Sequence, residues 1–325
     1  MAVHAIRIRQ TGGPEVLRWE EVEVGAPGAG EALVRHTAIG LNYIDVYHRT
    51  GLYPLPLPAV IGSEAAGVVE AVGAGVAELA PGDRVAYGGG VVGAYAEKRL
   101  IPAHRLVLLP AELDDRRAAA AMLKGLTAQY LLRRTFRVSE GDTVLIHAAA
   151  GGVGLIACQW AHHLGAIVVG TVSTEAKAAL ARAHGCDHPV VTTRESVVAR
   201  VREVTGGEGV DVVYDAVGKD TFEASLDCLK PMGLMVSYGN SSGPVAPFPP
   251  SLLAAKGSLF LTRPMLAAYT ARREELLAGA EELFDAIASG AVAIEVNQTY
   301  PLALAAQAHR DLEARRTTGS SVLLP

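Results

Sequence analysis

The chain has 325 residues, half of them hydrophobic, and 34 acidic against 29 basic side chains give a formal net charge of −5. This length favours two domains over one. An acidic chain with scattered Lys and Arg argues against nucleic acid or an anionic membrane surface as the main partner. The three cysteines, Cys158, Cys186 and Cys228, have no CxxC spacing, which is typical of a reducing compartment.

The first third of the chain is predicted to be a compact β-rich domain. Residues 3–9 read as its first strand, and residues 68–73 and 81–86 read as two strands joined by a loop. Regular turn signals without long helices support this interpretation. No signal-peptide pattern and no membrane-spanning apolar run is present, so we expect a cytoplasmic protein. Helical periodicity begins near residue 116 and continues to Tyr130, and we place the domain boundary near Gly125.

The middle of the chain alternates strands with helices. β-Branched strands are predicted at residues 143–147, 166–172, 210–215 and 233–238, with helical sequence between them. This alternation predicts a doubly wound parallel sheet. Beyond residue 261 the pattern predicts helices at 272–289 and 302–314 and a last strand at 320–324. This tail either extends the parallel sheet or returns to the first domain.

A turn of small residues joins the first of these strands to its helix. Ala148, Gly151 and Gly154 have a spacing close to the dinucleotide-binding fingerprint. Without side chains in the way, the backbone N–H groups of Gly151, Gly152 and Val153 can approach a pyrophosphate at the helix N-terminus. The sequence therefore predicts a nicotinamide or flavin cofactor.

The next strand indicates which dinucleotide binds. Enzymes that use NAD carry a carboxylate at its tip, whereas this chain has Ser173. Ser173 and Thr174 can donate to a 2′-phosphate and Lys177 adds a positive charge, so NADPH is favoured over NADH. Glu175 opposes this interpretation unless it points outward. The structural alternative is that Thr174 caps a helix and Lys177 is a solvated surface residue.

Several motifs in the same order identify a resemblance. The chain resembles the zinc-independent quinone oxidoreductases, or zeta-crystallin type, of the medium-chain dehydrogenase/reductase superfamily. The resemblance covers essentially the whole chain. It is carried by residues 12–17 (GGPEVL), 40–45 (GLNYID), 51–54 (GLYP), 62–67 (GSEAAG), 124–128 (KGLTA), 147–154 (HAAAGGVG), 238–243 (YGNSSG) and 318–321 (TGSS).

The resemblance implies an α/β protein with two domains. A GroES-like β-rich catalytic domain, residues 1–124 and 262–325, would be interrupted by a Rossmann domain with a doubly wound parallel sheet at residues 125–261. It also implies a homodimer built by pairing edge strands. Residues 256–261 form a plausible edge strand, and a bare apolar edge invites pairing.

The resemblance also bears on metal binding and on the reaction. Zinc members carry Cys and His at the positions of Asn42 and Ser63, and an amide and a hydroxyl are poor zinc ligands. We therefore expect no metal. A quinone is already electron-poor, so a hydride from NADPH can reach it once the two rings are held close. NADPH-dependent reduction of a small-molecule quinone is the predicted function.

Candidate site residues follow from the matching motifs. Asn42, Tyr47 and Tyr53 are the candidate catalytic residues, with the tyrosines lining the acceptor pocket. The expected cofactor contacts, in addition to the turn and the 2′-phosphate residues, are Asn42, Tyr43, Asp45, Lys124, Thr127, Tyr130, Tyr238, Gly239, Asn240, Ser241, Arg263 and Arg316.

Each candidate has a structural alternative. Tyr43 fits a core position, Asp45 fits a helix cap, and Arg263 and Arg316 fit exposed surface positions. Two other polar residues, Glu64 and His147, are expected to be structural rather than catalytic.

One departure from the resembling proteins and two other functions stay open. Thr192 stands where relatives often carry a tyrosine near the adenosine phosphate, and Arg194 is a possible substitute. Pro189 would disturb its strand unless it lies at the strand start. The first alternative function is an NADPH-dependent enone or alkenal reductase. The second is a non-catalytic NADPH-binding or RNA-binding protein, for which the acidic chain offers no basic stripe.

Overall fold

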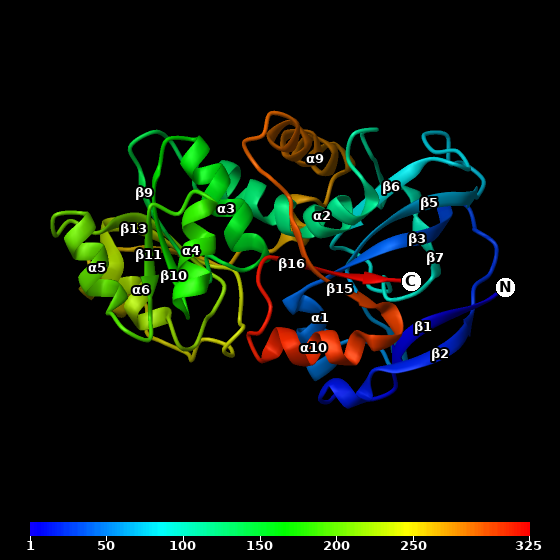
Figure 1. The fold of residues 1–325 in the computed structure, drawn as a ribbon, viewed down its shortest axis with the longest axis horizontal. Helices are drawn as coiled ribbons and strands as arrows, with labels where there is room; N and C mark the ends of the chain where they lie inside the picture. The colour runs from blue at the N-terminus through cyan, green and yellow to red at the C-terminus, as the bar shows by residue number, and fades with distance from the viewer. The chain divides into compact units, whose positions relative to one another are not determined.

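The computed structural model describes residues 1–325, which divide into two compact units (Figure 1). The first unit comprises Met1–Leu126, Thr270–Phe284 and Ile294–Pro325, and the second comprises Thr127–Tyr269 and Asp285–Ala293. The second unit is thus inserted into the first. Compared with the predicted boundaries, residues 125–126 group with the first unit, whereas 262–269 and 285–293 group with the second. Two helices, α2 (Asp115–Tyr130) and α9 (Arg273–Ala288), contribute residues to both.

The second unit is built on a six-stranded sheet in the order β11-β10-β9-β12-β13-β14. All of its strand pairs are parallel. This is the doubly wound order in which ligands bind at the carboxyl ends of the strands. The strands are β9 (Thr143–Ile146), β10 (Ile167–Val172), β11 (His188–Val191), β12 (Val210–Asp215), β13 (Leu229–Ser237) and β14 (Phe260–Thr262).

Helices cover both faces of this sheet. Helices α3 and α4 lie on one side of the strands and α5 and α6 on the other (Figure 1). Buried valines such as Val144, Val169 and Val213 give the strands their continuous apolar character, as expected for a sheet covered on both faces. The helical elements of the unit are η3 (Leu131–Thr135, a π-helix), α3 (Gly152–His163), α4 (Glu175–Ala183), α5 (Val197–Val204), α6 (Phe222–Cys228), α7 (Ser251–Ala255) and α8 (Leu266–Tyr269).

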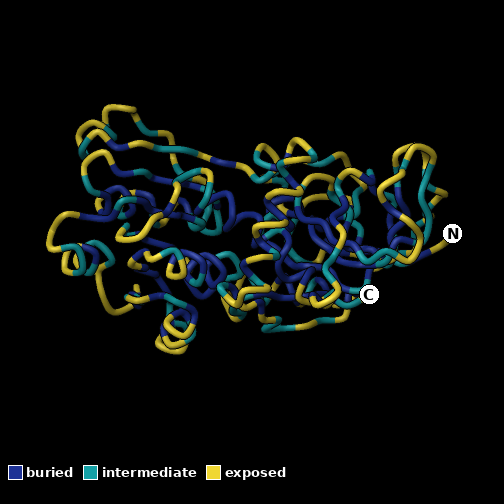
Figure 2. The backbone as a smooth tube through the Cα atoms, turned by 90° about the horizontal axis from the view of Figure 1, so that it is seen from above, coloured by how far each residue is buried: buried dark blue, intermediate teal, exposed yellow.

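The first unit contains two sheets. One is three-stranded, in the order β2-β1-β4, and the other runs β15-β16-β3-β5-β6-β8 with β7 also paired to β3. Buried residues follow these strands, and exposed residues concentrate in the loops (Figure 2). The elements before the insertion are β1 (Ala2–Ile8), η1 (Pro14–Val16), β2 (Arg18–Glu23), β3 (Glu31–Leu41), α1 (Tyr43–Thr50), β4 (Ala59–Val60), β5 (Glu64–Val72), β6 (Arg84–Gly88), β7 (Lys98–Pro102), η2 (Ala103–Arg105) and β8 (Val107–Leu108).

The tail of the chain returns to the first unit. Its elements after α9 are β15 (Val296–Pro301), η4 (Leu302–Leu304), α10 (Ala305–Glu313) and β16 (Ser320–Leu324). Strand β16 pairs antiparallel with β3, Val322 opposite Gly40, and parallel with β15. The tail therefore completes the first unit's larger sheet, which decides between the two alternatives that the sequence left open.

No helix in the structure combines the length and apolarity needed to cross a bilayer.

Two predicted strand details are corrected or refined. The predicted edge strand at 256–261 is too early, because only β14 (Phe260–Thr262) is strand. Gly257 and Ser258 have φ of 110° and 57°, so the chain turns there instead of extending. Pro189 is the second residue of β11, an edge strand, where its missing N–H is tolerated.

Candidate functional site

The small-residue turn lies at the carboxyl end of β9 in the second unit. Ala148 adopts a left-handed conformation with φ of 54°. Gly151 is the N-cap of α3 and supplies no side-chain cap, which leaves the first N–H groups of this helix available for an anion. A Cβ on Gly154 would lie 2.3 Å from the carbonyl oxygen of Ala148, so only glycine allows this close packing. These features fit a bound pyrophosphate.

The residues predicted to hold the 2′-phosphate follow β10. Thr174 caps α4 by accepting a hydrogen bond from the backbone N of Lys177 at 3.3 Å, as the structural alternative expected. Glu175, which opposes phosphate binding, forms an ion pair with Arg194 at 2.5 Å. Both side chains of this pair are exposed, at 60% and 68%. Thr192 is exposed, and its hydroxyl donates to the carbonyl of Val172 at 3.2 Å.

A third predicted segment, residues 238–241, follows β13 at the same edge of the sheet. Arg263 donates to the carbonyl oxygens of Ser237 at 2.8 Å and of Gly239 at 3.1 Å. Arg263 is exposed, as its structural alternative expected, and it also binds the backbone of the predicted cofactor loop. Tyr130, from α2, stacks on Tyr269 with ring centroids 4.4 Å apart. Thr127 is buried.

In the first unit, Asn42 lies in a buried cluster with two charged residues. Asn42 follows β3 directly and is the N-cap of α1, and its Nδ2 donates to Glu64 Oε2 at 2.8 Å. Lys124 Nζ binds the same carboxylate oxygen at 2.8 Å. The other oxygen, Oε1, accepts from the backbone N of Leu123 at 2.6 Å. Glu64 is fully buried, so its charge is balanced only inside this cluster.

Asp45, on the first turn of α1, accepts three hydrogen bonds. The donors are the backbone N of Asn42 at 2.9 Å, the hydroxyl of Ser63 at 2.9 Å and the hydroxyl of Tyr95 at 3.0 Å. Asp45 therefore does bind the N-terminus of the helix, as its structural alternative expected. Burial raises the pKa of Asp45 to about 7, because the desolvation of the charged form outweighs these donors and the nearby Lys124 cation.

A hydrogen-bonded chain leads from Asp45 to the tail. Arg49 donates to His309 Nδ1 at 3.1 Å, so the imidazole proton is on Nε2, which lies 3.1 Å from the hydroxyl of Tyr95. The hydroxyl of Tyr95 therefore accepts a hydrogen bond from His309 and donates one to Asp45. Glu313 holds the Arg49 guanidinium through two hydrogen bonds, at 2.8 and 2.7 Å. Sequence reasoning missed this chain, since no local pattern links positions so far apart.

The candidate acceptor tyrosines lie together. Tyr43 and Tyr47 are one helical turn apart on α1 with ring centroids 6.1 Å apart, and Tyr47 lies 5.2 Å from Tyr53. His48 also contacts Tyr53, at 6.1 Å, and its Nδ1 is buried without a partner. Burial raises the pKa of Tyr43, which keeps its hydroxyl protonated and able to donate.

Arg316 stands apart from this group. It pairs with Asp311 at 3.3 Å and its side chain is 71% exposed, so no described contact ties it to α1. His147, expected to be structural, is buried between Thr171 and Ser225, each 3.0 Å away. Sequence reasoning did not identify Asp215, whose buried carboxylate accepts from the backbone N of Val217 and Gly218 at the end of β12.

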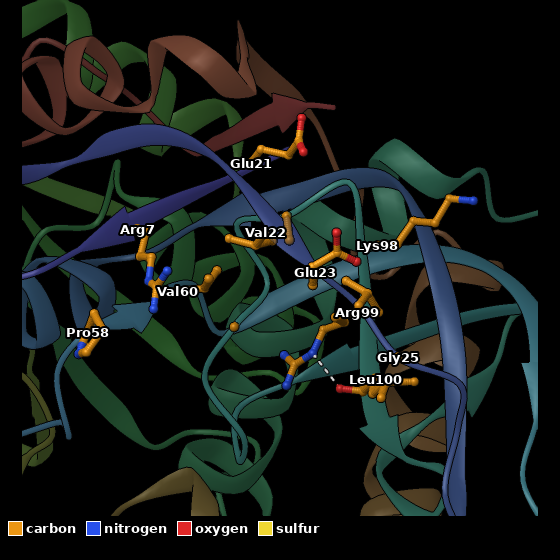
Figure 3. A pocket seen from close by; sticks show the side chains of 13 residues that line it. Arg7, Glu21, Val22, Glu23, Gly25, Pro58, Val60, Lys98, Arg99 and Leu100 are labelled. Atoms are coloured by element: carbon orange, nitrogen blue, oxygen red, sulfur yellow. Dashed lines mark hydrogen bonds between the residues drawn. The ribbon is translucent and has the colours of Figure 1, made fainter. Parts of the chain in front are cut away.

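A surface groove of about 550 Å³ lies beside β1, β2 and β7 in the first unit (Figure 3). Charged side chains surround it, and one of them, Arg99, is held by the carbonyl of Leu100 at 3.2 Å. None of the predicted site residues lines it, and its charges suit a planar apolar acceptor poorly. Its lining residues are Arg7, Glu21, Val22, Glu23, Val24, Gly25, Pro58, Val60, Gly93, Ala96, Lys98, Arg99 and Leu100.

No group of three or more His, Cys, Asp or Glu side chains is arranged to hold a metal ion. The two positions that are zinc ligands in the zinc enzymes make other contacts here. Asn42 binds Glu64, and the Ser63 hydroxyl donates to Asp45.

Comparisons with known proteins agree with this architecture. Residues 28–111 match the family model "Alcohol dehydrogenase GroES-like domain", and residues 152–278 match "Zinc-binding dehydrogenase". A quinone oxidoreductase of Pseudomonas aeruginosa is 54% identical over 98% of this chain and 99% of that protein. A 2-haloacrylate reductase of Burkholderia sp is 50% identical over 99% of both. The crystal structure of the Escherichia coli quinone oxidoreductase complexed with NADPH has a TM-score of 0.97 and 49% identity, covering 99% of this chain and 100% of that one.

Proposed function

The chain belongs to the zinc-independent quinone oxidoreductases of the medium-chain dehydrogenase/reductase superfamily, and we propose that it reduces quinones with NADPH by direct hydride transfer without a metal ion. The observation that carries the proposal is that the chain has both a glycine turn fit for a pyrophosphate and, at the positions of the zinc ligands, a buried amide and a hydroxyl that bind neighbouring carboxylates. NADPH is the cofactor, as in the similar Escherichia coli structure.

The chain's own residues have three tasks in this reaction. The backbone N–H groups of residues 151–153 bind the pyrophosphate, and Ser173, Thr174 and Lys177 hold the 2′-phosphate. Tyrosine hydroxyls from α1 donate to the quinone oxygen that becomes negative. When bound, NADPH supplies the hydride. Holding the two rings in register is worth up to about 7–11 kcal/mol of the barrier, which is why an electron-poor acceptor needs no metal.

The Glu175–Arg194 ion pair bears on the choice of cofactor. Arg194 pairs with Glu175, the carboxylate that opposes a 2′-phosphate, so Glu175 is a weaker obstacle to NADPH than its charge alone suggests. Because both side chains are exposed, solvent screening makes this a modest effect. We therefore expect a preference for NADPH with measurable activity with NADH.

A panel of acceptors tests the function. We expect steady oxidation of NADPH with benzoquinone and phenanthrenequinone, faster than with NADH and unchanged by a chelator. A primary alcohol with NADP⁺ should give no reverse reaction, because no metal activates its hydroxyl. If the chelator abolishes quinone turnover, or if quinones are inert while the cofactor binds, the proposal is wrong.

Reduction of an activated alkene is the second candidate. The observation in its favour is the 50% identity to a protein named 2-haloacrylate reductase. Such a substrate takes the hydride on carbon. It would use the same cofactor as a quinone but would need an acceptor pocket of a different shape. Turnover of an alkenal or a haloacrylate, with no turnover of quinones in the same panel, would favour this candidate.

We further propose a homodimer assembled through β14. This strand is the edge of the six-stranded sheet, and Phe260 on it is 63% exposed. Light scattering should give twice the chain mass of 33.9 kDa. A single chain mass at micromolar concentration would contradict the dimer. A cytoplasmic location stays a prediction.

A further inference from the structure

The amide of Asn42 has only one orientation compatible with its neighbours. Its side chain lies 2.8 Å from Glu64 Oε2, which also accepts from Lys124 Nζ at 2.8 Å. A carboxylate that takes hydrogen bonds from an ammonium group and from a backbone N–H has no hydrogen to give. The side of the amide that faces Glu64 must therefore be the NH2 group.

The second amide hydrogen is also turned into the protein. Asn42 Nδ2 lies 3.4 Å from the carbonyl oxygen of Gly40, a long contact in the direction that this hydrogen takes. The oxygen Oδ1 faces the backbone N of Asp45 in the capping box of α1. An amide oxygen has a second lone pair, and neither hydrogen bond of Nδ2 uses it. The part of this side chain left for a ligand is therefore a carbonyl oxygen, which only accepts hydrogen bonds.

An acceptor atom distinguishes the two reactants by their chemistry. An oxidised quinone offers oxygens that accept and has no N–H or O–H to donate. The nicotinamide half of NADPH has ribose hydroxyls and a carboxamide NH2, which donate. Oδ1 of Asn42 therefore suits the cofactor, and the quinone oxygen needs another donor.

We propose that Glu64 and Lys124 are positioning residues that turn the Asn42 amide so that its oxygen binds a donor on the nicotinamide half of the cofactor. Asn42 is then a cofactor-orienting residue and not the donor to the quinone oxygen, a task left to the tyrosine hydroxyls. This inference rests on the proposed function, because it assigns a part of the same site.

Lys124 is as necessary as Glu64 in this arrangement. Its side chain is 5% exposed, and Glu64 is fully buried, so each charge needs the other. Lys124 also keeps the Glu64 oxygen an acceptor, which is the condition for the orientation of Asn42. The predicted cofactor contact of Lys124 is thereby replaced by an indirect action through Glu64 and Asn42.

A swap of the two side-chain chemistries tests the orientation. Asn42→Asp alone sets two carboxylates against each other, and Glu64→Gln alone leaves an amide NH2 facing Lys124 and the Asn42 amide. In the double variant N42D/E64Q, the Gln NH2 donates to the Asp and the Gln oxygen accepts from Leu123 N. Lys124 loses its acceptor on residue 64 and must turn to the Asp, the nearest carboxylate that remains in the cluster. The total charge is unchanged, and an acceptor oxygen is again free for the cofactor.

We expect the double variant to bind NADPH at least about tenfold more tightly than either single variant and to recover kcat/KM with quinone in parallel. Thermal unfolding establishes that the variants are folded. A folded double variant that binds NADPH no better than the single variants overturns the proposal. The Asp at position 42 offers the cofactor an acceptor oxygen but no N–H, so this result would mean that the cofactor needs a donor from Asn42.

A second variant keeps the test decisive if the swap does not fold. Asn42→Ala leaves Glu64 paired with Lys124 and Leu123, so we expect it to fold. We expect its NADPH dissociation constant to rise roughly tenfold, with little change in the KM for quinone. Unchanged NADPH binding with a lowered kcat would contradict the proposal and assign Asn42 to the quinone oxygen. Asn297→Ala, in the same unit, is the control and should leave NADPH binding unchanged.

NADPH binding is measured without an acceptor, so the test of the Asn42 orientation does not depend on the test of quinone reduction. If the wild-type protein binds NADPH but reduces no quinone, the proposed function fails, and the binding data on the variants still decide the orientation of Asn42.

Discussion

Single buried residues give this protein its pH dependence. Two histidines of the first unit, His36 and His309, have pKa values lowered to about 3. Burial is the main cause in both, and the adjacent cation, Arg99 for His36 and Arg49 for His309, adds to it. Asp45 is the opposite case, with a pKa raised to about 7 by burial. A neutral histidine, His309, and a carboxyl group with a pKa near 7, Asp45, thus belong to one hydrogen-bonded chain through Tyr95, whereas His36 bonds Tyr87 and the carbonyl of Ala96.

The sign of each effect follows from proton binding. Below its ordinary pKa of 6.5, His309 takes up a proton in the unfolded chain but not in the folded one. The stability that this neutral imidazole contributes is therefore present above pH 6.5 and is lost as the pH falls toward 3. Asp45 acts in the other direction, because its folded form holds a proton up to about pH 7 and so loses stability as the pH rises.

We predict that His309→Gln flattens the acid side of the stability profile. Glutamine does not titrate, and its amide can still accept from Arg49 and donate to Tyr95. The slope of unfolding free energy against pH, from urea unfolding between about pH 6 and 4, should fall by up to about 1.4 kcal/mol per pH unit. His163→Gln, at an exposed position, is the control. Equal slopes in wild type and His309→Gln would show that His309 is already charged in the folded protein.

At the residue scale, the sequence identified Asn42 and Asp45 but not their partners. Asn42 binds Glu64 across 22 residues, and Tyr95 lies 214 residues from His309 along the chain. No local spacing encodes such pairs, which arise from the folding of β3, β5 and α10 into one unit. The motif singled out Asn42 and Asp45 as candidates, and the structure adds the hydrogen-bond partners that orient them.

At the scale of elements, the turn between β9 and α3 is the most constrained part of the second unit. Placing alanine in a helix normally gains about 1 kcal/mol over glycine. At Gly154 the added Cβ would lie 2.3 Å from the carbonyl oxygen of Ala148 and 2.8 Å from Ala149. These atoms are backbone, so the turn itself must move and steric strain outweighs the gain in helix propensity.

We predict that Gly154→Ala weakens NADPH binding by more than about tenfold and lowers the melting temperature. The reason is that the N-terminus of α3 must shift away from the place where its N–H groups meet the pyrophosphate. Gly25→Ala is the control, since a Cβ there meets nothing within 4 Å. An undisturbed cofactor affinity in Gly154→Ala would mean that the pyrophosphate does not bind at this turn.

Elements with a strong repeating pattern were predicted closely. The strands at 210–215 and 320–324 match β12 and β16 residue for residue, because each is rich in strand-forming valine, tyrosine or leucine and has a glycine just before it. The edge strand was placed too early, since residues 256–261 are apolar enough for a strand but Gly257 and Ser258 take positive φ. Apolar sequence alone does not reveal such a turn.

At the scale of the whole molecule, the second unit is inserted into the sequence of the first, so the first unit is formed from segments on both sides of the insertion. Strand β16 completes the sheet that β3 and β5 began, so the first unit's fold depends on residues at both ends of the chain. The sequence left the destination of the tail open, because strand pairing between distant segments has no local signature. The nucleotide-binding sheet, by contrast, comes from one continuous stretch and was predictable from its alternating pattern.

The central claim is that the protein transfers a hydride from NADPH to a quinone. The most direct test is the rate of quinone reduction with NADPH that carries deuterium at the transferring position of the nicotinamide, in the presence of a chelator. We predict a normal primary isotope effect on kcat/KM, equal with and without the chelator. No isotope effect in single turnovers, or turnover that stops with the chelator, would contradict direct, metal-free hydride transfer.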